Sequence, residues 1–444
     1  MRLASFCLSA LLAAPLAVGA APPSQAETAA LRAAIDDLAA SFPDRYPRAG
    51  EFRQRLGAVT NTTDFAALQR EALLANPLLD FDRVLAVRRA GHHGLPANFH
   101  SNSSIAKTGY DNAIIEFSLH GRTPDRVIYQ PEGKRFVGDL SLHFDASRLL
   151  FSMPTDKDWQ VHEVAVDGTG LRQVTPDIRP GIGNYDACYL PGGDIAFTSG
   201  LCMTSVPCVN GGAHVATLCR LYTATGKVRQ LGFDQEHNWT PRVMGDGTLL
   251  YQRWEYTDTP HSNTRLLMTM NPDGTNQREF YGSNSYWPAA FFYATPIPGS
   301  PTKVVGVSGG HHGDPRLGEL YVLDAALGRR EDKGVVRQIP SNPATPSGRG
   351  KIYDHMLNVW PRFLHPFPLS DKYFLVACQP SAKHTWGIYL VDAFDNFVLL
   401  KDQPGAMVIE PLALAPRPTP PVIPDRVQPD RTDDVVQIAD IYVG

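Results

Sequence analysis

The chain has 444 residues and a formal net charge of -4, from 41 basic and 45 acidic side chains. Because the sequence has no basic stripe and no lysine-rich tail, it lacks the electrostatic footprint of a nucleic-acid-binding protein, and that class is excluded. The 37 glycines and 37 prolines favour frequent turns and few long helices. The composition therefore favours β structure.

The N-terminal residues predict export. The run MRLASFCLSALLAAPLAVGA has one basic residue, Arg2, before a short apolar stretch and ends in small residues, which is typical of a secretory signal peptide. We expect residues 1–26 to be the signal peptide of a periplasmic protein; the alternative is an extracellular protein. No later stretch approaches eighteen uninterrupted apolar residues, so no membrane span is expected.

Residues 27–78 have the spacing of helices. The runs AETAALRAAIDDLAASF and DFAALQREALLANP repeat apolar residues at helical intervals. We expect Thr63 or Asp64 to cap the second helix and Pro77 to end it. The sequence thus predicts a short N-terminal helical segment.

Residues 79–415 alternate short apolar runs with turn signals, which is typical of many strands. Units with four strand-like runs begin near Asp139, Tyr185, Trp239, Trp287 and Trp360. A repeat of roughly 40 to 50 residues with several strands points to a β-propeller. Residues 83–130 lack the first strand of such a unit, and the late run MVIEPLAL has the character to supply it.

We therefore predict an all-β, six-bladed β-propeller whose ring is closed by a C-terminal strand, because closure removes exposed sheet edges. The proline-rich residues 416–444 are expected to form an extended tail.

One face of the predicted propeller carries the candidate ligand site. In a four-stranded blade, the loop between the second and third strands lies on the same face as the start of the innermost strand. The candidates at these places are Tyr185, Asp186, Trp239, Arg253, Glu255, Asp258, His261, Asp314, His355, Trp360 and His384. The plainer alternatives are tryptophans that wedge blades together and a salt bridge between Arg253 and Glu255, two apart on one strand.

The candidate metal ligands are His237, His311, His312, Cys202 and Cys208. Imidazoles and thiolates are the usual ligands of zinc, so zinc or another divalent metal is the candidate cofactor. The alternatives are loop histidines that bind nothing, a hydrogen bond from His237 to a backbone carbonyl, and a disulfide between Cys202 and Cys208.

The sequence has no nucleophile elbow, no glycine-rich phosphate loop and no C-x-x-C-H haem-attachment motif. Hydrolase and nucleotide-binding functions therefore lack support, and covalent haem is not expected.

Segments throughout the repeats carry a family resemblance. They are NPLLDFDRVLAVRR, YDACYLPGGDIAFTS, VPC after Cys202, FDQEHNWTPRV, LYQRWEYTDTPH, MNPDGT, YGSNSYWP, SGGHHG, FLHPFPLSDKYFLV and WGIYLVDAFDN. Over about Asn76 to Pro420 the chain resembles the hydrazine synthase alpha-subunit-related proteins. The resemblance implies a six-bladed propeller, and it implies that the haem-bearing domain and its chemistry are absent here. The five candidate metal ligands match positions in these motifs.

The sequence favours a non-enzymatic exported propeller that binds a small molecule, a metal or a partner protein. One alternative is a metal-dependent enzyme with His237, His311 and His312 as ligands and Asp186 or Glu255 as base. Another is a docking fragment of a longer multidomain protein.

Overall fold

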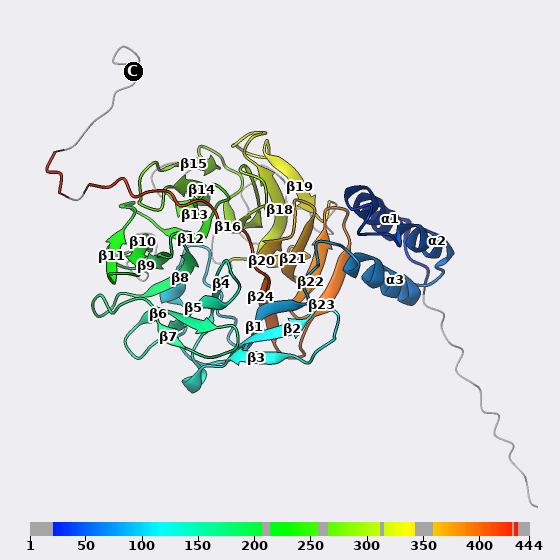
Figure 1. Ribbon diagram of the computed structural model, residues 1–444, viewed down its shortest axis with the longest axis horizontal. Helices are drawn as coiled ribbons and strands as arrows, with labels where there is room; N and C mark the ends of the chain where they lie inside the picture. Colours follow the sequence, from blue (N-terminus) through cyan, green and yellow to red (C-terminus); the bar gives the residue numbers. More distant parts are fainter. Residues whose placement is uncertain are drawn as a thin grey trace, which may run out of the picture. The chain divides into compact units, whose positions relative to one another are not determined.

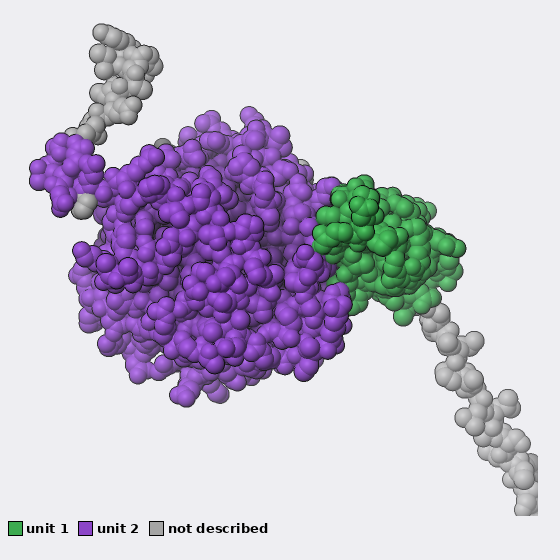
Figure 2. All heavy atoms as spheres, viewed as in Figure 1, with its two compact units in different colours: residues 1–77 green, residues 78–444 purple. Residues whose placement is uncertain are grey.

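The computed structural model describes residues 21–206, 214–255, 265–310, 315–341, 358–428 and 430–433. The chain forms two compact parts, one up to Pro77 and one from Leu78 onward (Figure 2). Residues 1–20 of the predicted signal peptide lie outside the described residues, whereas residues 21–26 are described and include Ser24 and Gln25 at the start of the first helix. Among those that are described, no helix has the length and apolar character needed to cross a bilayer.

The N-terminal part contains the helices α1 (Gln25–Ser41), α2 (Ala49–Ala58) and α3 (Thr62–Leu74). The helix α2 lies inside the predicted helical segment, between the two runs with helical spacing; it contains two glycines and has no side-chain cap. It buries Phe52 and Leu56 and contacts both other helices. Packing of its apolar face therefore stabilises a helix of weak intrinsic propensity.

The start of α3 differs from the prediction. Its N-cap is Asn61, whose side-chain oxygen accepts the backbone N–H of Asp64 at 2.9 Å. The predicted cap at Thr63 or Asp64 is therefore wrong, because the asparagine satisfies the free N–H groups of the first turn from further upstream.

The part from Leu78 onward contains twenty-four described strands in six consecutive groups of four. The groups are β24 (Met407–Ala413) with β1 (Arg83–Gly91), β2 (Tyr110–Ser118) and β3 (Arg126–Tyr129); β4 (Gly138–Leu142), β5 (Arg148–Pro154), β6 (Trp159–Ala165) and β7 (Arg172–Gln173); β8 (Asn184–Tyr189), β9 (Ile195–Ser199), β10 (Thr217–Tyr222) and β11 (Lys227–Gln230); β12 (Asn238–Val243), β13 (Leu249–Trp254), β14 (Arg265–Met270) and β15 (Arg278–Tyr281); β16 (Ala290–Pro296), β17 (Lys303–Gly309), β18 (Gly318–Asp324) and β19 (Val335–Ile339); and β20 (Arg362–Pro368), β21 (Tyr373–Gln379), β22 (Gly387–Asp392) and β23 (Phe397–Lys401).

Strands within a group pair antiparallel with their neighbours. Three groups are separate sheets, and the other three are joined by the single pairs Arg265↔Ala290 and Gly318↔Phe363. The run predicted to complete the first unit does pair with it, since β24 is antiparallel to β1 with Ile409 opposite Val87.

The first strand of each group lies innermost (Figure 1). These innermost strands contact one another in the order β24, β4, β8, β12, β16 and β20, and β20 contacts β24 again. Apolar side chains fill the space between successive groups. One buried cluster, for example, joins Leu250 of the fourth group to Trp287 and Tyr321 of the fifth.

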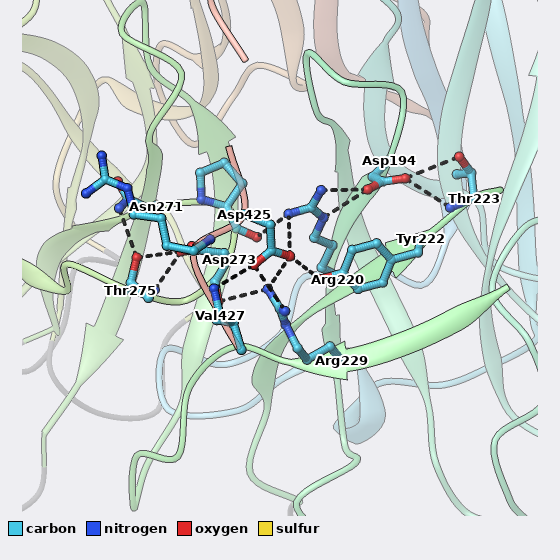
Figure 3. Close-up of polar contacts among 12 residues, drawn as sticks. Asp194, Arg220, Tyr222, Thr223, Arg229, Asn271, Asp273, Thr275, Asp425 and Val427 are labelled. Atoms are coloured by element: carbon cyan, nitrogen blue, oxygen red, sulfur yellow. Dashed lines mark hydrogen bonds and ion pairs between the residues drawn. The ribbon is translucent and has the colours of Figure 1, made fainter. Parts of the chain in front are cut away.

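Beyond β24, the tail has no strand within the described residues, but it is attached to the sheets. The backbone N–H of Arg417 donates to the carbonyl oxygen of Phe144 at 2.8 Å. Further on, Asp425 pairs with Arg229 at 3.0 Å and accepts a hydrogen bond from the hydroxyl of Tyr222 (Figure 3). The backbone N–H of Arg426 donates to Asp273, which follows β14, at 2.8 Å, so the tail runs from the second group past the third to the fourth.

Candidate functional site

Each innermost strand contains one extra residue at the same place. In β4, Gly138 pairs with Ser152 and Ser141 pairs with Leu150, so three steps along β4 match two along β5. The same shift of one residue occurs in β8, β12, β16, β20 and β24. Such a β-bulge changes the direction in which a side chain points.

Every one of these bulges contains a residue with a positive φ. The residues and their φ angles are Asp139 (57°), Asp186 (47°), Thr240 (50°), Tyr293 (54°), His365 (49°) and Glu410 (59°). This conformation costs a residue with a Cβ roughly 1–2 kcal/mol, and glycine would avoid that cost. None of the six is glycine, which indicates that their side chains are needed here. We call these six residues the inner ring.

The inner ring lies on the wall of a cavity of about 330 Å³ among the innermost strands, which we call the central cavity. Toward the C-terminal ends of those strands the wall is mostly apolar and includes Phe144, Val243 and Phe367, together with Arg417, whose guanidinium lies over the ring of Phe144 at 4.9 Å. At the other end, the wall contains Arg316 and residues of the β1–β2 loop, such as Asn102. The central cavity therefore has one polar end and one mostly apolar end.

Charge is divided unevenly around the inner ring. Glu410, Asp139 and Asp186 stand on three successive innermost strands and form an acidic arc. The other three strands contribute Thr240, Tyr293 and His365, and the rings of Tyr293 and His365 are 4.1 Å apart.

The carboxylates of the acidic arc influence one another. Burial, with a further contribution from Asp139, raises the pKa of Glu410 to about 7. Burial and the neighbouring Asp186 raise the pKa of Asp139 to about 6. The backbone N–H of Leu140 donates to Glu410 Oε2 at 2.8 Å, and the amide of Asn102 donates to Asp139 Oδ2 at 2.5 Å. Burial and mutual repulsion therefore keep protons on Asp139 and Glu410 to a higher pH than on exposed carboxylates.

Arginines beside the inner ring direct donors to backbone carbonyl oxygens. These contacts are Arg89 to Val137 at 2.6 Å, Arg242 to Pro241 at 2.8 Å, Arg417 to Leu142 at 3.0 Å, and Arg316 to His100. Two of the four also approach the acidic arc, Arg242 at 3.4 Å from Asp186 and Arg89 at 3.8 Å from Glu410.

His365 is the neutral imidazole of the inner ring. Burial, followed by the charges of Arg89 and Arg242, holds its pKa well below the ordinary value. Its Nδ1 atom is buried and has no hydrogen-bond partner among the described residues. An unpaired buried polar atom of this kind is costly to the folded state.

Comparisons with known proteins identify the fold. The sequence matches no known protein family and no curated protein. The structure is similar to hydrazine synthase of Kuenenia stuttgartiensis, with a TM-score of 0.59 and 16% identity over 78% of this chain and 48% of that one. It is also similar to TolB from Acinetobacter baumannii, with a TM-score of 0.49 and 11% identity over 80% and 73% of the two chains.

The fold is a β-propeller. At 16% identity the similarity to hydrazine synthase shows the fold alone, and this chain spans about half of the hydrazine synthase chain.

Within the propeller, the predicted metal ligand His237 is a fully buried side chain. Its Nδ1 accepts the backbone N–H of Ala216 at 2.9 Å. The ring stacks on Trp239 at 4.4 Å and Trp254 at 6.1 Å. Burial, and then the charge of Arg316, holds its pKa well below the ordinary value. One ring nitrogen of His237 is thus committed to the backbone.

The remaining candidate metal ligands are only partly described. His311, His312 and Cys208 lie outside the described residues, while Cys202 Sγ lies 3.4 Å from the carbonyl oxygen of Val215. Within the described ranges, no three His, Cys, Asp or Glu side chains are grouped to hold a metal ion. The metal site and the disulfide therefore stay predictions.

Of the predicted ligand-face residues that are described, Asp186 alone belongs to the inner ring. Tyr185 and Trp239 lie buried in an apolar cluster that includes Phe99 and Ile105 of the β1–β2 loop. Their large side chains are therefore covered.

The other described candidates lie away from the central cavity wall. Arg253 is 3.7 Å from Glu255 and 2.9 Å from Asp234. Trp360 has the guanidinium of Arg362 over its ring at 3.9 Å. His384 is exposed and contacts Ser381 at 2.8 Å. Asp258, His261, Asp314 and His355 lie outside the described residues.

Five members of the inner ring were not predicted from the sequence as site residues. A signal for them does exist. When the innermost strands are aligned, the polar residue always stands one place after the last regular pair, as in Tyr185-Asp186, Trp239-Thr240, Leu364-His365 and Ile409-Glu410. A polar side chain that recurs at the same place in all six repeats is the sequence signal for residues that face the central cavity.

Proposed function

We propose that this chain is an exported six-bladed β-propeller, related to the hydrazine synthase alpha-subunit-related proteins, that binds a small molecule in its central cavity without haem chemistry of its own. The six groups are the blades, and β24 closes the ring. The cyclic order of contacts among the innermost strands supports this arrangement. The signal-like N-terminal sequence supports export.

The inner ring is the observation that carries the proposal. Six non-glycine residues accept a costly backbone conformation at equivalent places, and all six side chains line one cavity. Strained residues persist where the surrounding structure holds them for a purpose, often in ligand sites. A concave site with an apolar wall and a few convergent polar groups is the usual form of a small-molecule site.

The chemistry of the wall favours binding. Cys188 also lines the central cavity, but burial raises its pKa to about 12. Since the thiolate is the reactive form of cysteine, this thiol is not an activated nucleophile. What the wall offers to a ligand is hydrogen bonds and charge, and not a reactive thiol.

Small molecules that co-purify with the protein test the proposal. The protein is isolated from the exported fraction, its N-terminus is sequenced to test signal removal, and compounds released on unfolding are identified by mass spectrometry. We expect a compound that is retained by the wild type and by Asp156→Asn, whose carboxylate is 92% exposed, but is lost from Asp139→Asn. Recovery of the same compounds from all three proteins, or of none, argues against a ligand in the central cavity.

A further inference from the structure

We infer that the inner ring recognises an organic cation, with an amine head at the acidic arc and an apolar body toward the C-terminal ends of the innermost strands. This inference rests on the proposed function and assigns a ligand class to the same site.

The acidic arc has unused acceptor capacity. An ionised carboxylate offers about four acceptor positions. Among the described residues, Glu410 accepts one backbone N–H, from Leu140, while Asp186 accepts the backbone N–H of Thr240 at 2.9 Å and a longer hydrogen bond from Arg242. Their other oxygens have only the longer contacts, Arg89 at 3.8 Å and Arg242 at 3.4 Å. An ammonium group supplies the N–H donors that these oxygens lack.

The charge balance of the arc points the same way. Asp139 stands between the other two carboxylates, and in the described part of the chain it has hydrogen bonds but no ion pair. Like charges at close range disfavour ionisation, and a nearby opposite charge reverses that effect. A cation among the three carboxylates would therefore stabilise Asp139 and Glu410 in the ionised form.

An anionic head group fits the polar end of the central cavity less well than a cationic one. The guanidinium of Arg89 lies over the ring of Phe136 at 4.3 Å, and that of Arg316 lies over Trp239 at 4.5 Å. The Nε atoms of both arginines lack partners in the described structure and could serve an anion. Such an anion, however, would stand beside the acidic arc, where like charge opposes it.

The opposite end of the central cavity sets the character of the ligand body. Phe144, Val243, Pro296, Phe367 and Leu412 contribute to that wall. Burying apolar surface is worth roughly 25 cal/mol per Å². An aromatic or aliphatic body therefore gains affinity there, while the head remains at the inner ring.

Three probes with one body and different heads test the ligand class. Phenethylamine, 2-phenylethanol and phenylacetate carry a cationic, a neutral and an anionic head, and their binding to the mature chain is measured by calorimetry near pH 7.5. We expect phenethylamine to bind most tightly and phenylacetate most weakly. Asp139→Asn is expected to weaken phenethylamine about tenfold, the loss of one charge-assisted contact, and to leave 2-phenylethanol unchanged. Asp156→Asn serves as the control and should bind like the wild type.

Proton release provides a second readout. A bound cation lowers the raised pKa values of Asp139 and Glu410, so protons leave the site and the buffer takes them up. We expect the heat of phenethylamine binding to be more exothermic in Tris than in phosphate, because Tris releases more heat on protonation. Equal heats in the two buffers would contradict the inference.

The outcomes separate this inference from the proposed function. Tightest binding of phenylacetate, equal binding of all three probes, or binding of none overturns the cationic class. The co-purification experiment does not depend on these probes, so it decides separately whether the central cavity holds a ligand.

Discussion

The hydroxyl of Tyr222 donates a 2.6 Å hydrogen bond to the carboxylate of Asp425, although 203 residues separate the two in the chain. Arg229 approaches the same carboxylate at 3.0 Å (Figure 3). Nearby, a Cβ added to Gly247 would meet the carbonyl oxygen of Pro421 at 2.2 Å, so the tail lies directly on the turn. A segment that by sequence is an extended linker is thus attached at a defined place.

Asp425→Ala tests this attachment. We expect the free energy of unfolding to fall by about 1–2 kcal/mol, since a charged hydrogen bond is lost and its partners stay partly buried. Trypsin should also cleave after Arg426 faster than in the wild type. Urea denaturation and timed digestion measure the two effects. The control is Asp433→Ala, whose carboxylate pairs with the exposed Arg431 and should leave both measurements unchanged; an equal response of the two variants would refute the attachment.

The acidic arc predicts how stability depends on pH. Burial raises the pKa of Glu410 from its ordinary 4.5 to about 7, so the folded protein keeps a proton that the unfolded chain loses between these values. Through this carboxyl, the free energy of unfolding falls as pH rises from about 4.5 to 7 and levels off above that. Asp392 and Glu236, whose pKa values burial also raises to about 7, act in the same direction. His237 and His365, whose pKa values burial holds below the ordinary 6.5, act in the opposite direction up to that pH.

Melting temperatures from pH 5 to pH 8 check this dependence. Glu410→Gln should flatten the profile in part, since the amide keeps an acceptor for the Leu140 N–H but has no proton to lose. Glu132→Gln, at an exposed position, should keep the wild-type slope. A Glu410→Gln profile parallel to the wild type would show that this carboxyl ionises normally.

The positive φ angles of the inner ring predict that a glycine variant at these positions is more stable than an alanine variant, which is the reverse of the usual order. At Thr240 we expect the glycine variant to be more stable than the alanine variant by about 1 kcal/mol, because the left-handed conformation penalises a Cβ. At Thr198, a buried position in β9 without positive φ, alanine should be the more stable by about 0.5–1 kcal/mol. Urea denaturation of the four variants measures both differences, and the same order at both sites would speak against the bulge geometry.

The space around Gly138 shows that the acidic arc is tightly packed at this residue. A Cβ at this residue would meet Arg89 Nη2 at 2.7 Å and Glu410 Oε1 at 2.9 Å. We expect Gly138→Ala to lower the free energy of unfolding by about 1–3 kcal/mol through overpacking. Gly245→Ala, where a Cβ meets nothing within 4 Å, should change it little. Denaturant titration compares them, and equal stabilities would mean that the space beside Arg89 and Glu410 is looser than described.

Much of the fold could be predicted because its signals are local. Alternating apolar residues between turn signals predicted the strands. The three-strand unit at residues 83–130 predicted that β24 would pair with β1, since an incomplete sheet leaves an open edge. The helix α2 could not be predicted in this way, because its stability comes from burying Phe52 and Leu56 against other helices.

Little of the candidate site could be predicted, although its residues are plain in the sequence. Asp186 was selected for its place at the start of a repeat, whereas His365 and Glu410 read as ordinary polar residues within strands. Their direction depends on a one-residue bulge, and a bulge is a property of the pairing between two strands.

By itself, the sequence determined the repeated strands, the pairing of the last strand with the first unit, and the polar residue at one place in every repeat. Only the tertiary structure decided that those residues turn inward and meet around one cavity, as with Asp139 and Glu410, which stand at opposite ends of the propeller sequence. The physical reason is that strand patterns are set by neighbours in the chain, whereas the inner ring is set by strand register and by the contacts among the innermost strands.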